Sequence, residues 1–163
     1  MLIKFYNVKP ENLKEEWEHI LPWLNKLENI EGTLIPDLYD KDDIFDMCKN
    51  KPDIFQIWIA KEDNECLGMI TTTVASLPKG NVFIYENIIG KHSSKWFDIA
   101  MKKMTLYAKT NKCKLMLAPT SKEILDTISK PNDFAKGVGL NNKRGFQEDH
   151  NWNEAIFLCR KWI

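Results

Sequence analysis

The residue types best suited to chemistry stand together in the segment Gly90-Lys91-His92-Ser93-Ser94. Gly90 permits a backbone turn that other residues resist, and Ser93 or Ser94 can cap a helix that begins there. The free amides of a helix N-terminus behind a strand end can bind a phosphate. The segment therefore predicts a phosphate-binding turn. The alternative interpretation is an ordinary loop with the N-cap that every helix needs.

A single carboxylate, Glu86, stands just before this segment in an apolar run. Burial beside apolar strand residues would raise its pKa into the range in which a carboxylate works as a general base. The alternative is a glutamate at a strand edge that points to water. His19 and His150 are far apart in the sequence and lack neighbouring ligands, so we expect no metal site.

These residues would be held by a strand, a turn, a helix and a second strand. Residues 82–85 are rich in aromatic and branched side chains, and Glu86 and Asn87 interrupt this strand. Residues 113–118 form a short apolar strand that Pro119 closes. Between the strands, apolar residues recur at three- and four-residue spacing: Phe97, Ala100, Met101, Met104 and Ala108. This order predicts a parallel β-α-β unit.

The rest of the chain adds elements before and after this unit. Pro22 lies within the first predicted helix and should kink or split it. The other predicted elements are a strand at 2–8, a helix from 10 to 27, an acidic helix at about 38–48, a strand hairpin at 53–60 and 66–75, a helix at 122–129, an irregular loop at 131–139 and a final strand at 153–163. Together they predict one mixed α/β domain over 1–163, with a mostly antiparallel sheet, one β-α-β crossover and helices on both faces.

Composition limits the class of protein. The 163 residues are 44% hydrophobic and 28% charged, which indicates a folded chain rather than a disordered one. Lys plus Arg equal Asp plus Glu at 23 each, so nucleic-acid binding is not indicated. No apolar run approaches membrane-spanning length, and the four scattered cysteines are typical of reduced thiols. We therefore expect a cytoplasmic protein without membrane insertion.

The order of the predicted elements resembles the GNAT superfamily of N-acyltransferases over about residues 2–163. Residues 71–79 and the short loop at Gly90 look most like the small GNAT-like proteins of tailed bacteriophages. Three short motifs add to the resemblance: Trp58-Ile59-Ala60 with Leu67-Gly68-Met69-Ile70 in the hairpin, Tyr107-Ala108 with Asn111-Lys112-Cys113 at the end of the helix, and Arg144-Gly145-Phe146 before the last strand. Their order carries more weight than any one of them.

The resemblance implies acetyl-CoA as the cofactor and an amine as the substrate. Glu86 would be the catalytic residue, the base that takes the proton of the amine directly or through water. The amides of Ile89 and Gly90, or their neighbours on the splayed strand, would polarise the carbonyl. The candidate cofactor-binding residues are Ile88, Ile89, Gly90, Lys91, His92, Ser93 and Ser94.

The sequence also departs from the family's pattern. The motif R/Q-x-x-G-x-G/A normally wraps the coenzyme A pyrophosphate with consecutive amides, and here only Gly90 remains of it. The family's tyrosine, which often reprotonates the leaving thiolate, falls at Asn141, and asparagine cannot do so. A second interpretation is therefore a catalytically degenerate GNAT-fold phage protein. It would lie in the host cytoplasm or the virion and act as a virion component or bind a host protein.

Overall fold

The computed structural model of the chain describes residues 2–28, 39–120 and 157–162, with the backbone alone at 118–120 and 157–162. One six-stranded sheet forms its centre, and the strands follow one another across it in chain order. β4 and β5 run parallel, and every other neighbouring pair is antiparallel. The strands are β1 (Ile3–Asn7), β2 (Phe55–Glu62), β3 (Glu65–Leu77), β4 (Gly80–Gly90), β5 (Cys113–Thr120) and β6 (Phe157–Trp162). The predicted fold class is confirmed.

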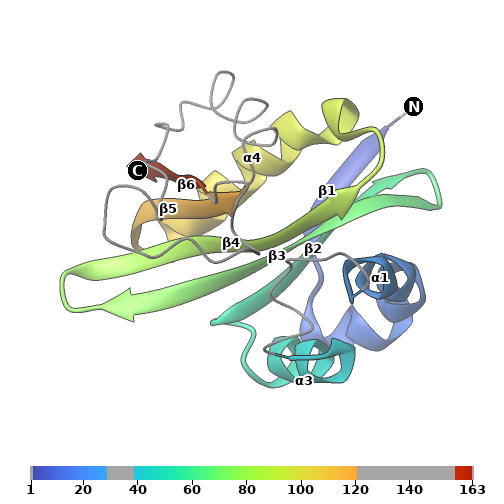
Figure 1. The fold of residues 1–163 in the computed structure, drawn as a ribbon, viewed down its shortest axis with the longest axis horizontal. Coiled ribbons are helices and arrows are strands. Elements are labelled where there is room, and N and C mark those ends of the chain that lie inside the picture. The colour runs from blue at the N-terminus through green and yellow to red at the C-terminus, as the bar shows by residue number, and fades with distance from the viewer. Residues whose placement is uncertain (1, 29–38, 121–156, 163) are drawn as a thin grey trace, which may run out of the picture.

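Helices cover both faces of this sheet (Figure 1). A 3-10 turn (Pro10–Asn12) leads into α1 (Leu13–Glu28), which lies with α3 (Lys41–Asn50) on one face. α4 (Ser93–Thr110) lies on the other face and connects β4 to β5. The passage from a strand through a helix to a parallel neighbour is the β-α-β crossover that the sequence predicts.

Alternation along β2 sends side chains into two separate cores. Trp58 faces α4, whereas its neighbours Ile57 and Ile59 face α1 and α3. On the α4 side, the ring of Phe5 stacks on Trp58 with 5.6 Å between centroids and on Trp96 with 6.2 Å. Each face of the sheet therefore holds its helices through its own set of apolar contacts.

Neither proline breaks its element as predicted. Pro22 does not split the first helix, because α1 continues through it; the alternative, a kink, stays a prediction. Pro22 lies on an exposed face, where water can satisfy the carbonyl that a proline leaves without a partner. Pro119 does not end its strand either, because β5 runs to Thr120. This part of β5 pairs with β6 and no longer with β4, and a proline is tolerated where one edge of a strand needs no donor.

Several predictions lie outside the described residues: the helix at 122–129, the loop at 131–139, the asparagine at the family's tyrosine position and the motif Arg144-Gly145-Phe146. The extent of a single domain over 1–163 stays a prediction. Within the described ranges, no helix combines the length and the apolar character that a membrane crossing requires.

Candidate functional site

β4 and β5 separate part-way along their length. They pair from Asn81 to Ile84 of β4. Beyond that point β4 continues to Gly90 alongside β3, while β5 continues to Thr120 alongside β6. In the described part of the chain, the edge of β4 beyond Ile84 thus has no strand on its β5 side. Backbone groups on this edge can pair with a ligand.

A β-bulge lies at the beginning of this open edge. Thr71 of β3 is opposite Asn87 and Thr72 is opposite Tyr85, so Glu86 is an extra residue without a partner in β3. Tyr85 packs into the core against α4, whereas Glu86 faces the side of α3. The predicted interruption at Glu86 and Asn87 is therefore a bulge within a continuous strand.

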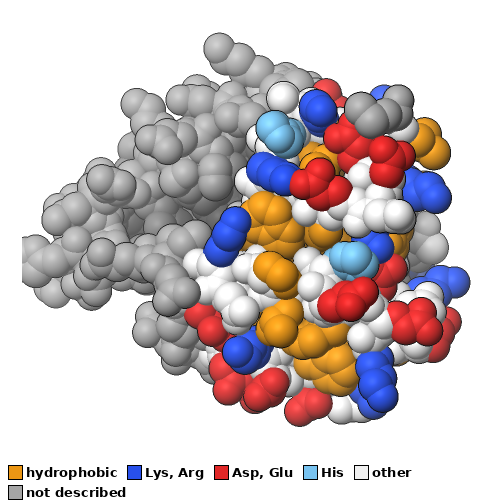
Figure 2. Space-filling model, turned by 90° about the vertical axis from the view of Figure 1, so that its right-hand side faces the viewer, with side chains coloured by type: hydrophobic (Ala, Val, Ile, Leu, Met, Phe, Trp, Pro, Cys, Tyr) orange, Lys and Arg blue, Asp and Glu red, His pale blue; other side chains and the backbone are white. Residues whose placement is uncertain are grey.

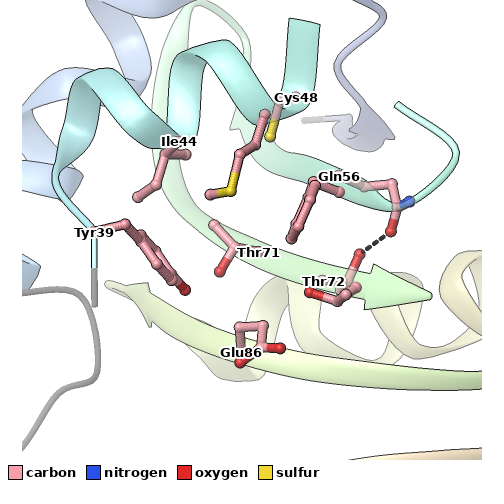
Figure 3. A pocket seen from close by; sticks show the side chains of 10 residues that line it. Tyr39, Ile44, Cys48, Gln56, Thr71, Thr72 and Glu86 are labelled. Carbon is pink, nitrogen blue, oxygen red and sulfur yellow. Dashed lines mark hydrogen bonds between the residues drawn. The ribbon is translucent and has the colours of Figure 1, made fainter. Parts of the chain in front are cut away.

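Glu86 faces a small pocket between α3 and the sheet (Figure 3). The free volume of the pocket is about 20 Å3, which is room for about one water molecule. In Figure 3, the hydroxyl of Tyr39 points toward Thr71 and Glu86. The lining residues are Tyr39, Ile44, Met47, Cys48, Phe55, Gln56, Thr71, Thr72, Thr73 and Glu86.

The start of α3 holds Tyr39 at this pocket. Asp40 Oδ1 accepts a hydrogen bond from the Asp43 N–H at 2.9 Å, and Asp43 Oδ2 accepts one from the Asp40 N–H at 3.0 Å. This reciprocal capping box fixes the residue at which α3 begins. The side chain just before the cap is thereby directed toward the sheet.

Burial raises the pKa values of the three ionisable side chains that line the pocket. Burial raises the pKa of the Glu86 carboxyl, although interaction with the Thr73 side chain opposes this rise. Burial and the negative charge of Glu86 raise the pKa of Tyr39, and burial raises the pKa of Cys48 to about 12. The phenol and the thiol are therefore neutral at neutral pH. Because the described part of the lining includes no Lys, Arg or His, the charge that it carries comes from the Glu86 carboxylate.

The neighbouring polar side chains already have partners. The Thr72 hydroxyl donates to Gln56 Oε1 at 2.7 Å and accepts from Trp58 Nε1 at 2.9 Å. Asn87 Nδ2 donates to Thr71 Oγ1 at 2.9 Å. These bonds fix the sheet side of the pocket. Among the described residues, the pocket's carboxylate forms no ion pair.

The chain passes from β4 into α4 through Lys91 and His92. The Lys91 N–H donates to Leu67 O at 2.8 Å, which extends the β3–β4 ladder past the end of β4. The Lys91 carbonyl accepts from Trp96 Nε1 at 3.0 Å, and the Trp96 side chain is fully buried. With Lys91 held at both ends, His92 makes the reversal in the left-handed conformation, at φ 53°.

His92 is therefore the N-cap of α4, and the prediction that Ser93 or Ser94 caps this helix is wrong. Both serines lie inside the first turn, where their N–H groups have no backbone acceptor among the described residues. This turn contains no acidic side chain, so the positive end of the helix dipole is not offset there.

Gly90 is required for close packing rather than for turning. Its φ does not lie in the left-handed region, so the predicted reason for a glycine is wrong. A Cβ on Gly90 would lie 2.7 Å from Leu67 O and 2.9 Å from the ring of Trp96. The opposite residue, Gly68, is equally crowded, because its added Cβ would lie 2.6 Å from Ile89 O.

Alternation along β4 decides which amides face the open edge. Because the Lys91 N–H bonds to β3, the N–H and C=O groups of Gly90 and Ile88 point away from β3. Ile89 lies between them and points toward β3, where it is opposite Met69. The open edge therefore presents the amides of Ile88 and Gly90, while the Ile89 amide belongs to the β3–β4 ladder.

The lysines at the start of α4 have acidic partners. Lys91 pairs with Glu65, and Lys95 Nζ lies 3.5 Å from Glu62 Oε2. Hydrogen bonding to Lys91 lowers the pKa of the Glu65 carboxyl. An anion at this end of the helix would compete with both carboxylates for the ammonium groups.

Other site chemistries have little support in the described ranges. No three side chains of His, Cys, Asp or Glu gather there in an arrangement that could hold a metal ion. Cys48, Cys66 and Cys113 are free thiols, and the Cys159 side chain lies outside the description. Acidic and basic side chains are interspersed over the face in Figure 2. That face therefore lacks the continuous positive surface that nucleic-acid binding requires.

Known proteins share this arrangement at the level of the fold. No protein-family model and no curated protein matches the chain. A GNAT-family acetyltransferase from Streptococcus pneumoniae matches 99% of this chain and 100% of its own length, with a TM-score of 0.70 and 11% identity. The chain has the GNAT fold. An N-acetyltransferase from Staphylococcus aureus matches 98% of this GNAT-fold chain and 96% of its own (TM-score 0.60, 11% identity). Glucosamine-6-phosphate N-acetyltransferase from Arabidopsis thaliana matches 85% and 95% (TM-score 0.60, 12% identity).

In this GNAT fold the predicted site residues occupy two adjoining places. Glu86 faces the pocket, and the residues from Ile88 to Ser94 run along the open edge into the first turn of α4. Sequence reasoning missed Tyr39 and the threonines at 71–73. A run of three threonines in one strand is a signal for a polar patch on a sheet face. Connecting this signal with Glu86 requires knowing that β3 pairs with β4.

Proposed function

We propose that this chain is an N-acyltransferase that transfers an acetyl group from acetyl-CoA to an amine. The observation that carries the proposal is the position of Glu86. It projects from a bulge close to the point where β4 leaves β5, into a pocket to which the described residues contribute no basic side chain. A half-buried carboxylate with a raised pKa, next to an open backbone edge, has the properties of a general base. The GNAT fold of solved acetyltransferases supports the reaction class.

The open edge of β4 suits the extended arm of the cofactor. Ile88 and Gly90 present N–H and C=O groups that can pair with an extended chain bearing amides. The first-turn amides of Ser93 and Ser94 come next along the chain and can hold a phosphate oxygen. When bound, acetyl-CoA would supply the acyl group as an activated thioester.

The protein's own groups would prepare the amine and stabilise the developing charge. Glu86 would accept a proton from the substrate ammonium and so free the lone pair of its nitrogen. A carboxylate with a raised pKa is the more effective base, because its pKa lies closer to the working pH. The N–H of Ile88 or Gly90 would donate toward the acyl oxygen, where negative charge develops. Tyr39 and Thr73 would hold the amine beside the carboxylate.

A second candidate is a GNAT-fold protein without turnover, acting as a virion component or as a binder of a host protein. The start of α4 favours it. Lys91 and Lys95 are paired with Glu65 and Glu62, and the Lys91 N–H belongs to the β3–β4 ladder. This connection therefore offers a phosphate fewer groups than a glycine-rich loop with consecutive free amides would offer.

Calorimetric titration with acetyl-CoA, followed by a thiol-release assay over a panel of amines, separates the two candidates. An acyltransferase should bind acetyl-CoA at micromolar concentration and release coenzyme A when a suitable amine is present. The absence of heat and of a thermal shift at millimolar acetyl-CoA would refute the acyltransferase and leave the role without turnover. Gly90→Val is a poor probe here, because the crowding around Gly90 would disturb the fold as well as the site.

A further inference from the structure

We infer that the pocket at Glu86 binds the ammonium end of a slender, unbranched primary alkylamine, such as a lysine side chain or a linear diamine. The inference rests on the proposed function for its meaning, because the bound amine would be the acyl acceptor. The binding itself needs no cofactor, so it can be tested separately. Three properties of the pocket support it: its charge, its hydrogen-bond acceptors and its size.

The charge of the pocket selects a cation. Glu86 is half-buried, and no Lys, Arg or His of the described residues forms an ion pair with it. The other ionisable groups of the lining, Tyr39 and Cys48, are neutral at neutral pH. A partly buried charge without a counter-ion is unfavourable, so a ligand that brings the opposite charge is stabilised. The apolar surroundings strengthen this attraction relative to water.

The acceptors of the pocket suit a primary ammonium group. Such a group carries three donors and no acceptor. The Glu86 carboxylate and the hydroxyls of Tyr39 and Thr73 line the pocket and can accept these donors. The hydroxyl of Thr72 already lies between two partners. A quaternary ammonium has no donor and would leave these acceptors unsatisfied, at a cost in affinity.

The size and the walls of the pocket suit an unbranched chain. The free space of about 20 Å3 admits a terminal group close to the size of water. Ile44, Met47 and Phe55 supply apolar walls for the methylene groups that follow. The rings of Phe55 and Tyr39 can also attract a cation through their faces. A branched or ring carbon bonded directly to the nitrogen would need space that these walls occupy.

Calorimetry on the full chain without acetyl-CoA tests this inference, in phosphate buffer because common buffers are themselves amines. The probes are n-butylamine, n-butanol and cyclohexylamine at neutral pH. n-Butylammonium should bind at millimolar concentration. n-Butanol has the chain without the charge, and cyclohexylammonium has the charge on a ring carbon. Both should bind at least about tenfold more weakly.

Variants locate the site. Glu86→Gln should weaken n-butylammonium binding at least about tenfold, and Glu86→Asp, which keeps the charge but withdraws it, should lie between glutamine and the wild type. Asp98→Asn removes an exposed carboxylate from α4, on the opposite side of the sheet, and should leave binding unchanged. Thermal melts establish that each variant is folded.

The outcomes separate this inference from the proposed function. Equal affinity for n-butylammonium and cyclohexylammonium, or unchanged binding in folded Glu86→Gln, would overturn the inference. So would the absence of any n-butylammonium binding, whatever acetyl-CoA does. If n-butylammonium binds through Glu86 but acetyl-CoA does not bind, the pocket is an alkylammonium site and the acyltransferase proposal fails. If both bind and n-butylamine is acetylated, both stand.

Discussion

Gly68 of β3 and Gly90 of β4 face each other so closely that a Cβ on either would lie 2.8 Å from the Cα of the other. They form a pair without mutual hydrogen bonds, the type in which opposite Cα atoms approach most closely. The ring of Trp96 lies over both, 2.9 Å from either added Cβ. A glycine that resembles part of a cofactor motif therefore also joins the sheet to α4.

Gly90→Ala should lower the free energy of unfolding by roughly 1–3 kcal/mol, because the added methyl group meets backbone atoms that cannot move cheaply. Gly68→Ala should behave in the same way. Urea denaturation measures both. Ser76→Ala, at an exposed position of β3, is the control and should stay within about 0.5 kcal/mol of the wild type. Wild-type stability in Gly90→Ala would contradict the crowding.

The β4-α4-β5 unit could be predicted because its pattern is local. Its two strands contain the short apolar runs at 82–85 and 113–118, and the predicted helical stripe, which includes Phe97, Met101 and Met104, is the buried face of α4. The two-residue turn between β2 and β3 also follows from local composition, since Asp63 and Asn64 tolerate such turns. For these elements, the local sequence is enough to predict the secondary structure.

The geometry of the site could not be predicted because it depends on contacts between distant segments. The left-handed His92 follows from Lys91 being bonded to both Leu67 and Trp96. The bulge at Glu86 follows from the register with β3, which no periodicity of β4 records. The position of Tyr39 likewise depends on how α3 packs on the sheet.

If Glu86 is the base, Glu86→Gln should lower turnover by about two to four orders of magnitude, because glutamine keeps the shape but cannot accept a proton. The affinity for acetyl-CoA should stay nearly unchanged, since the amides that would hold it lie further along β4. A thiol-release assay and calorimetry measure the two effects. Asp98→Asn is the matched control and should keep wild-type turnover. Unchanged turnover in Glu86→Gln would exclude this residue as the base.

Burial of Glu86 should also appear in the pH dependence of stability. Burial raises the pKa of its carboxyl in the folded protein above the ordinary value of 4.5. The folded state therefore holds this proton more tightly than the unfolded state. The protonated Glu86 carboxyl therefore contributes to the stability of the folded state. This contribution is complete below pH 4.5 and is lost as the pH rises through the raised pKa. Glu86→Gln resembles the protonated form at every pH.

Glu86→Gln should therefore melt at a higher temperature than the wild type at neutral pH, and the difference should shrink as the solution is acidified. Thermal melts of both forms from about pH 8 to about pH 4 measure it. A difference that does not change with pH, or a lower melting temperature for Glu86→Gln at neutral pH, would mean that the carboxylate is stabilised in the folded state by contacts other than those described.

The ion pairs at the start of α4 make a last prediction about the cofactor. Lys91 pairs with Glu65 and Lys95 with Glu62, so if acetyl-CoA binds along β4 as proposed, both lysines would exchange a carboxylate for a phosphate. The double variant Glu62→Gln/Glu65→Gln frees both ammonium groups. Because such ion pairs are weak, the dissociation constant for acetyl-CoA should fall by roughly two- to fivefold for each lysine freed. Calorimetry at low salt measures the gain in affinity, which should largely disappear at about 1 M salt.

Glu18→Gln, which removes an exposed carboxylate from α1, is the matched control and should leave the affinity for acetyl-CoA unchanged. Equal or weaker binding by the double variant would mean that the phosphates of the cofactor do not reach this end of α4.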